Sequence, residues 1–180
     1  ISHPLPQPFV VIATQNPTGA AGTQLLPDSQ MDRFTVRLSL GYPSPKDEAA
    51  MVQSRQGGNP LALIRPVVTR EQLAAMQDEA AAVYMKAELI DYTVSLIGAT
   101  RAHPLILRGA SPRATLSVTA MAKSVAYVQG RDYVVPKDVQ TVFVSTVAHR
   151  LLMSPEAEAK AITPETVLEE ILKRTPAPRV

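Results

Sequence analysis

From Thr69 onward the apolar residues of this sequence recur at helical spacing, and this period limits what the chain can fold into. Amphipathic stretches cover about 69–83, 87–102, 112–129, 136–153 and 164–173. The clearest apolar stripes are Leu89, Ile90, Val94 and Ile97, then Val139, Val142, Phe143 and Val147, and then Val167, Leu168, Ile171 and Leu172. Each stripe needs a partner face that covers it. The second part of the chain is therefore expected to be a bundle of helices.

Two runs near the beginning of the sequence have the pattern of β-strands. Residues 9–14 are continuously apolar and β-branched, which is typical of a strand buried on both faces of a parallel sheet. Residues 34–40 alternate apolar and polar side chains, as a neighbouring strand would. Because two strands do not make a stable sheet, the other strands are either missing from this chain or supplied by a partner. We expect the chain to be a fragment of a longer protein.

A break in every period separates these two regions. Residues 57–66 contain Gly-Gly-Asn-Pro and fit neither a helix nor a strand, which indicates a linker. A short helix is expected after Pro27, and a longer one over about 45–56. We predict three parts: a mixed α/β part over 1–57, a linker over 58–68 and a helical domain over 69–180.

Composition excludes several classes of protein. The 180 residues are 46% hydrophobic and 19% charged, which is a globular balance. The 18 Lys and Arg nearly cancel the 16 Asp and Glu, so a nucleic-acid-binding surface is not expected. There are no cysteines, which fits a reducing compartment such as the cytoplasm, and the three histidines show no metal-ligand spacing. No apolar run approaches the roughly 20 residues of a transmembrane helix, so no membrane insertion is expected.

Two candidate functional residues lie near the predicted strands. Asn16 follows the first strand at its carboxyl end, where parallel sheets place residues that contact ligands. Arg33 precedes the second strand, where its planar cation could reach a phosphate of a neighbouring molecule. Taken alone, Asn16 is more simply part of a turn that ends the strand. Arg33 is more simply a surface charge paired with Asp28, Asp32 or another acid.

A third candidate lies at a predicted helix start. Ser111 and Pro112 have the residue types of an N-cap and a first helical position, and Arg113 follows in the first turn. A cation there opposes the helix dipole by about 0.3–1 kcal/mol unless an anion meets it. A phosphate is one such anion. We therefore favour a functional role for Arg113 and simple capping for Ser111.

The sequence lacks the motifs of a complete nucleotide site. Neither Gly-x-x-x-x-Gly-Lys-Ser/Thr nor an apolar strand that ends in Asp-Glu occurs. The chain alone is therefore not expected to cradle phosphates, bind magnesium or hydrolyse a nucleotide.

Several segments, in this order and spacing, nevertheless resemble the MoxR family of AAA+ ATPases. They are Phe9–Pro17, Leu26–Phe34, Gly41–Pro43, Ala99–Arg101, Gly109–Ala114, Gly130–Val139 and His149–Leu151. The resemblance covers nearly the whole chain. It implies an α/β remnant of a P-loop AAA+ core over 1–57, followed by an all-α helical-bundle lid domain over 69–180, so that the fold is predominantly α.

The resemblance also implies roles for the three candidates. Asn16 looks like sensor 1, which orients the attacking water. Arg33 looks like the arginine finger that one subunit offers to the next. Arg113 looks like sensor 2 on the lid. The loop over 18–25 departs from the acidic and aromatic residues that relatives often have there.

For the complete protein, the family pattern implies ATP and Mg²⁺ as cofactors and a ring, with six subunits expected, that remodels or matures client proteins as a chaperone does. A von Willebrand factor A domain protein is a further expected partner. No tightly bound cofactor is expected on this chain alone. The alternative from another class is a nucleotide-independent helical interaction module built on the bundle.

Overall fold

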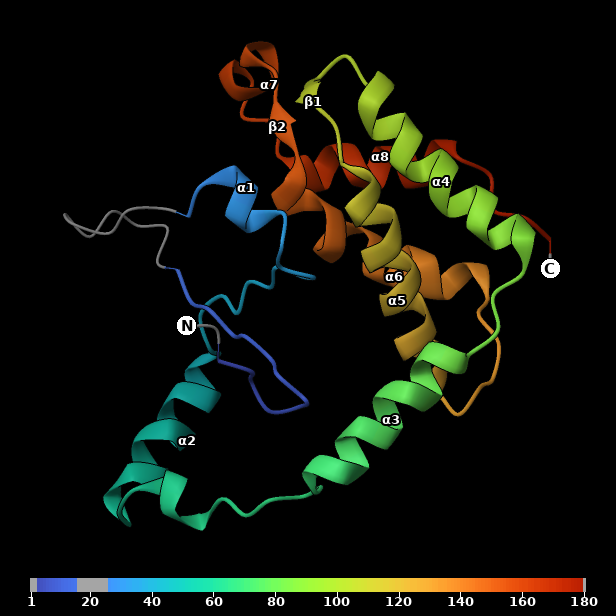
Figure 1. The fold of residues 1–180 in the computed structure, drawn as a ribbon. Helices are drawn as coiled ribbons and strands as arrows, with labels where there is room; N and C mark the ends of the chain where they lie inside the picture. The colour runs from blue at the N-terminus through green and yellow to red at the C-terminus, as the bar shows by residue number, and fades with distance from the viewer. Residues whose placement is uncertain (1–2, 16–25, 180) are drawn as a thin grey trace. The chain divides into compact units, whose positions relative to one another are not determined.

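The structure is a computed structural model that describes residues 3–15 and 26–179, and it is mainly helical (Figure 1). Two compact units are present: one comprises 3–9 and Leu38–Met76, and the other comprises 10–15, 26–37 and 77–179. The predominantly α fold is therefore as predicted. The predicted part boundaries at 57/58 and 68/69 stay a prediction.

The first unit contains two short helices whose starts follow directly from the sequence. Helix α2 (Pro45–Gln56) begins after Ser44, whose hydroxyl accepts a hydrogen bond from the Asp47 amide at 3.2 Å. The 3₁₀ helix η1 (Pro60–Leu63) lies inside the predicted linker and is capped by the Asn59 side chain. The predicted helix over 45–56 is thus confirmed.

Helix α3 (Arg70–Ala82) runs from the first unit into the second. Its start is a capping box, in which the Thr69 hydroxyl accepts from the Gln72 amide and the Gln72 side chain accepts from the Thr69 amide. This pair holds the start of the helix at the residue that the sequence indicates.

The second unit is a bundle of four longer helices with smaller elements around it (Figure 1). The bundle helices are α4 (Ala87–Ala102), α5 (Pro112–Val128), α6 (Pro136–Val147) and α8 (Pro164–Arg174). The smaller elements are α1 (Asp28–Met31), β1 (Ile106–Arg108), η2 (Ala148–Arg150), β2 (Leu152–Met153) and α7 (Pro155–Ala159). No helix in the described residues is long and apolar enough to span a bilayer.

The bundle core confirms two predicted stripes and corrects the third. The whole α6 stripe is buried, and the α8 stripe packs against the same core. On α4, however, Ile90 and Val94 are 45% and 52% exposed, although Leu89 and Ile97 are buried. Thr93 and Thr100 face the core instead, because their hydroxyls donate to backbone carbonyls of their own helix. A hydroxyl satisfied in this way can be buried at little cost.

The predicted strands at 9–14 and 34–40 are wrong in this structure. Neither forms a β ladder among the described residues, and apolar side chains such as Ile12 and Leu40 are 89% and 97% exposed. A strand buried on both faces needs hydrogen-bonded neighbours, and the described residues supply none. The only described sheet is the unpredicted antiparallel pair β1–β2. The predicted helix over 136–153 ends at Val147, where η2 begins, and its last two predicted residues form β2 instead.

Candidate functional site

The start of α5 is held in place by the end of α4. The Arg101 side chain donates from Nε to the Ala110 carbonyl at 2.8 Å, and the Ala110 amide donates to the Thr100 hydroxyl at 3.1 Å. Gly109 lies so close to α4 that an added Cβ would stand 2.7 Å from the Arg101 Cα. Glycine is therefore required here for the close approach of the two backbones.

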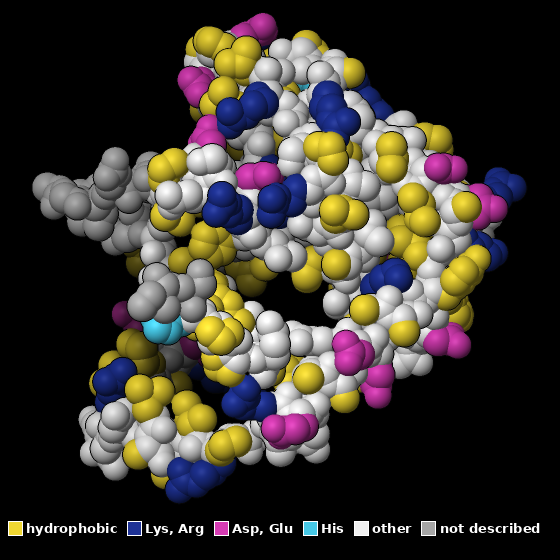
Figure 2. Space-filling view, viewed as in Figure 1, with side chains coloured by type: hydrophobic (Ala, Val, Ile, Leu, Met, Phe, Trp, Pro, Cys, Tyr) yellow, Lys and Arg dark blue, Asp and Glu magenta, His cyan; other side chains and the backbone are white. Residues whose placement is uncertain are grey.

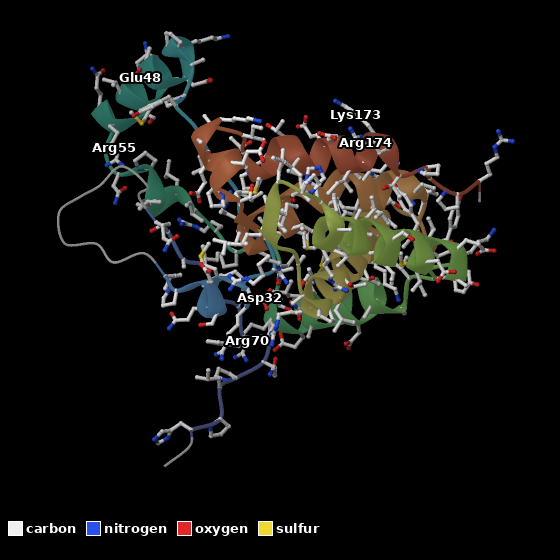
Figure 3. All side chains as sticks on the ribbon, turned by 90° about the horizontal axis from the view of Figure 1, so that it is seen from above. Asp32, Glu48, Arg55, Arg70, Lys173 and Arg174 are labelled. Atoms are coloured by element: carbon white, nitrogen blue, oxygen red, sulfur yellow. The ribbon has the colours of Figure 1, made fainter. Side chains whose placement is uncertain are left out.

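Asp32, which follows α1, lies at this helix start. Figure 3 labels Asp32 between α1 and the bundle helices, and Figure 2 shows basic and acidic side chains close together on this part of the surface. The Ser111 hydroxyl donates to the Asp32 carboxylate at 3.2 Å and makes no cap hydrogen bond to its own helix. The expected capping role of Ser111 is therefore wrong, because its hydroxyl bonds a carboxylate that is distant in the sequence.

Arg113 lies in the first turn of α5, as predicted, and it meets an anion there. Its Nε is 3.5 Å from the Asp32 carboxylate, and its side chain is 58% exposed. The negative charge of Asp32 offsets both the Arg113 cation and the positive end of the helix. The anion that the sequence argument required is thus present within the chain itself.

Arg33 is exposed, and among the described residues it forms no ion pair. The simpler pairing with Asp28 or Asp32 is wrong, because both carboxylates have other partners. Asp28 pairs with Arg108 at 2.5 Å, and Asp32 pairs with arginines of the bundle. The third candidate, Asn16, lies outside the described residues.

Two further residues join this site, and neither was a candidate by itself. Arg150 in η2 donates to the Phe34 carbonyl at 2.7 Å and lies 3.4 Å from the Asp32 carboxylate. His149 places Nε2 at 3.0 Å from the same carbonyl. The Phe34 and Asp32 partners lie more than 100 positions away in the sequence, so no local pattern predicts these contacts. In the sequence, His149 and Arg150 stood out only as part of His149–Leu151, one of the segments that resemble the MoxR family.

Burial decides the charge state of His149. Because a carbonyl only accepts, Nε2 carries the proton that bonds Phe34, and Nδ1 has no partner among the described residues. Burial lowers the pKa of His149, and the nearby Arg150 and Arg37 cations lower it further. The Phe34 carbonyl and Asp32 act in the opposite direction but do not reverse the shift. Burial also lowers the pKa of Arg150, which still stays charged.

The lowered pKa of His149 predicts a loss of stability in mild acid. Below about pH 6.5 the unfolded chain binds a proton at this histidine, whereas the folded chain binds it only at lower pH. The unfolded state then holds more protons than the folded state. The free energy of unfolding therefore decreases as the pH is lowered, by at most about 1.4 kcal/mol per pH unit. Urea denaturation of the chain between about pH 7.5 and 5 measures this fall. His149→Gln should flatten it, and parallel curves for the two proteins would contradict the assignment.

Comparisons with known proteins agree with this architecture. The profile of the AAA lid domain matches residues 98–171, and the profile of the ATPase family associated with various cellular activities (AAA) matches residues 1–36. Chaperone MoxR1 of Mycobacterium tuberculosis is 38% identical over 99% of this chain and 49% of its own length. Uncharacterized protein YeaC of Bacillus subtilis is 34% identical over 97% of this chain and 54% of its own length.

A solved structure extends the comparison from sequence to fold. The crystal structure of a proposed ATPase from Cytophaga hutchinsonii has a TM-score of 0.91 and 31% identity, and the match covers 98% of this chain and 56% of that one. The comparisons support a MoxR-like AAA+ ATPase, which this chain resembles over nearly its whole length. The chain corresponds to the C-terminal portion of such an ATPase and spans about half the length of the curated relatives it matches. The predicted fold class, an AAA+ portion with a helical lid, is confirmed.

Proposed function

We propose that this MoxR-like chain is the sensing portion of an ATPase that hydrolyses ATP in a ring and remodels client proteins. One observation carries the proposal: the segment that bears Arg33 is docked on the helix start that bears Arg113, with Asp32 between them. Cations that converge on one anion at a helix N-terminus suit the recognition of phosphate. The name of one relative, Chaperone MoxR1, supports the chaperone-like role.

In this proposal Arg113 acts as sensor 2 by exchanging Asp32 for a nucleotide phosphate. Its contact with Asp32 is long, at 3.5 Å, and the Arg113 side chain is 58% exposed, so the contact costs little to break. Asp32 would not be left alone, because the Ser111 hydroxyl and Arg150 also contact it. The described residues thus fit a phosphate.

In the described ranges no three acidic or histidine side chains converge. In the complete protein Mg²⁺ would neutralise the charge that develops on the transferring phosphate. Asn16 would orient the attacking water as sensor 1, and Arg33 would reach the site of the next subunit as an arginine finger. A von Willebrand factor A domain protein as partner, and the cytoplasm as location, belong to the same proposal.

The proposal is tested by Arg113→Ala in the complete protein. Loss of one charge-assisted contact to phosphate is expected to weaken ATP binding by about 10-fold or more. Isothermal titration with ATP and steady-state hydrolysis measure the effect. Arg174→Ala is the matched control, because Arg174 is an exposed arginine of α8 in the same bundle (labelled in Figure 3), and its one ion pair in the described part of the chain is with Glu170.

Unchanged ATP binding by Arg113→Ala would contradict the sensor 2 role. If the complete wild-type protein neither bound nor hydrolysed ATP, the ATPase proposal itself would fail. The helical interaction module would then be the better account.

A further inference from the structure

Arg150 is a buried arginine whose acceptors lie mostly outside its own helical bundle. Its side chain is 1% exposed. Nη2 donates to the Phe34 carbonyl at 2.7 Å and to the Ser117 hydroxyl at 3.0 Å, and Nη1 lies 3.4 Å from the Asp32 carboxylate. Nε has no partner in the described part of the chain. A buried guanidinium needs acceptors, and two of these three belong to the segment that follows α1.

These two acceptors flank Arg33 on either side. Asp32 is held through its carboxylate by Ser111 and Arg150, and Phe34 is held through its carbonyl by Arg150 and His149. Arg33 lies between two fixed neighbours, and its own side chain is exposed. Holding the residues on both sides of Arg33 restricts the directions in which its side chain can point.

More contacts attach the same segment to the same bundle. Asp28 pairs with Arg108 next to α5, the Arg37 amide donates to the Ser145 carbonyl of α6 at 3.0 Å, and the Arg37 side chain pairs with Glu165 of α8 at 2.7 Å. The segment would therefore follow a movement of the bundle. Of its contacts, those of Arg150 come from the most deeply buried side chain and reach both residues next to Arg33 in the sequence.

We infer that Arg150 is a positioning residue, which holds the loop over 32–34 so that the bundle determines where Arg33 is presented. The inference rests on the proposed role of Arg33 as the arginine finger. It adds a residue of the lid that acts through Arg33 and touches no nucleotide. Detaching the loop would also leave a buried cation with only the Ser117 hydroxyl, so the attachment is strongly favoured.

The test is steady-state ATP hydrolysis by the complete protein with Arg150→Ala, measured beside Arg33→Ala. A misplaced finger lowers turnover without removing substrate contacts, so kcat should fall by about 100-fold while KM stays within about threefold. Arg150→Lys keeps the cation but cannot bridge both acceptors. It should fold even where the alanine variant does not, and its kcat should fall by about 10-fold with the same KM.

The matched control is Arg131→Ala, which removes another partly buried arginine of the bundle. Arg131 pairs with Asp138 at 2.7 Å and contacts no residue of the loop over 32–34. Hydrogen exchange of the Arg37 amide adds a direct readout of the attachment, because that amide bonds α6. Exchange should become faster in Arg150→Ala and stay unchanged in Arg131→Ala.

Each outcome separates the inference from the proposal beneath it. Wild-type kcat in both Arg150 variants, together with a strong loss in Arg33→Ala, would overturn the positioning role and leave the arginine finger in place. Equal losses of kcat in the Arg150 variants and Arg131→Ala would also overturn it, since the effect would then be general destabilisation. Unchanged turnover in Arg33→Ala would overturn both.

Discussion

Arg33→Ala in the complete protein is expected to lower the kcat of ATP hydrolysis by about 10³-fold or more, with ATP affinity within about threefold of the wild type. An arginine finger stabilises charge that develops on the transferring phosphoryl group, so its loss affects the transition state more than the bound substrate. The exposed side chain of Arg33, without an ion pair among the described residues, is suited to contact another subunit. Steady-state kinetics with a separate binding titration measure both quantities.

Arg55→Ala is the control for this prediction. Arg55 is an exposed arginine in the last turn of α2, and its backbone carbonyl accepts a hydrogen bond at the helix end. Its replacement should leave kcat within about twofold of wild type, as most surface substitutions do. Equal kcat values for Arg33→Ala and Arg55→Ala would refute the arginine finger.

Phe143→Ala is expected to lower the free energy of unfolding by about 3–5 kcal/mol. Phe143 lies on α6, is fully buried, and is the largest of the fully buried side chains in the described core. Its truncation removes apolar contacts and leaves a cavity that rigid helices fill only in part. Urea denaturation of the chain, followed by circular dichroism of the helices, measures the loss.

Leu116→Ala on α5 serves as the comparison, because Leu116 is also a large apolar helix residue but is 72% exposed. Its replacement should change stability by no more than about 0.5 kcal/mol. A loss below about 1 kcal/mol for Phe143→Ala would contradict the assigned core, since a fully buried phenylalanine cannot be removed at so small a cost.

Local signals in the sequence predicted the helices well. Proline at the first position marks the starts of α2, α5, α6 and α8, and the Thr69–Gln72 capping box marks α3. These signals act within four residues, so they do not depend on the rest of the fold. Burial was harder to predict where a threonine replaces an apolar residue, as at Thr93 on α4.

Structure that depends on distant partners could not be predicted in the same way. The run at 9–14 has the composition of a buried strand, yet the described residues contain no neighbour to pair with it. At the site, the sequence identified Arg113 as a cation in need of an anion, but it did not show that Asp32 supplies one. Arg150 was missed because a buried arginine is recognisable only from its acceptors, and these lie more than 30 positions away.

The division of the proposed ATP site between subunits is tested most directly by mixing two inactive proteins. One is Arg33→Ala, and the other is the complete protein with the lysine of its phosphate-binding loop replaced. In an equal mixture about one interface in four would join an intact phosphate-binding loop to an intact Arg33. The account predicts that ATP hydrolysis returns on mixing. A mixture that forms joint rings and stays as inactive as its components would contradict it.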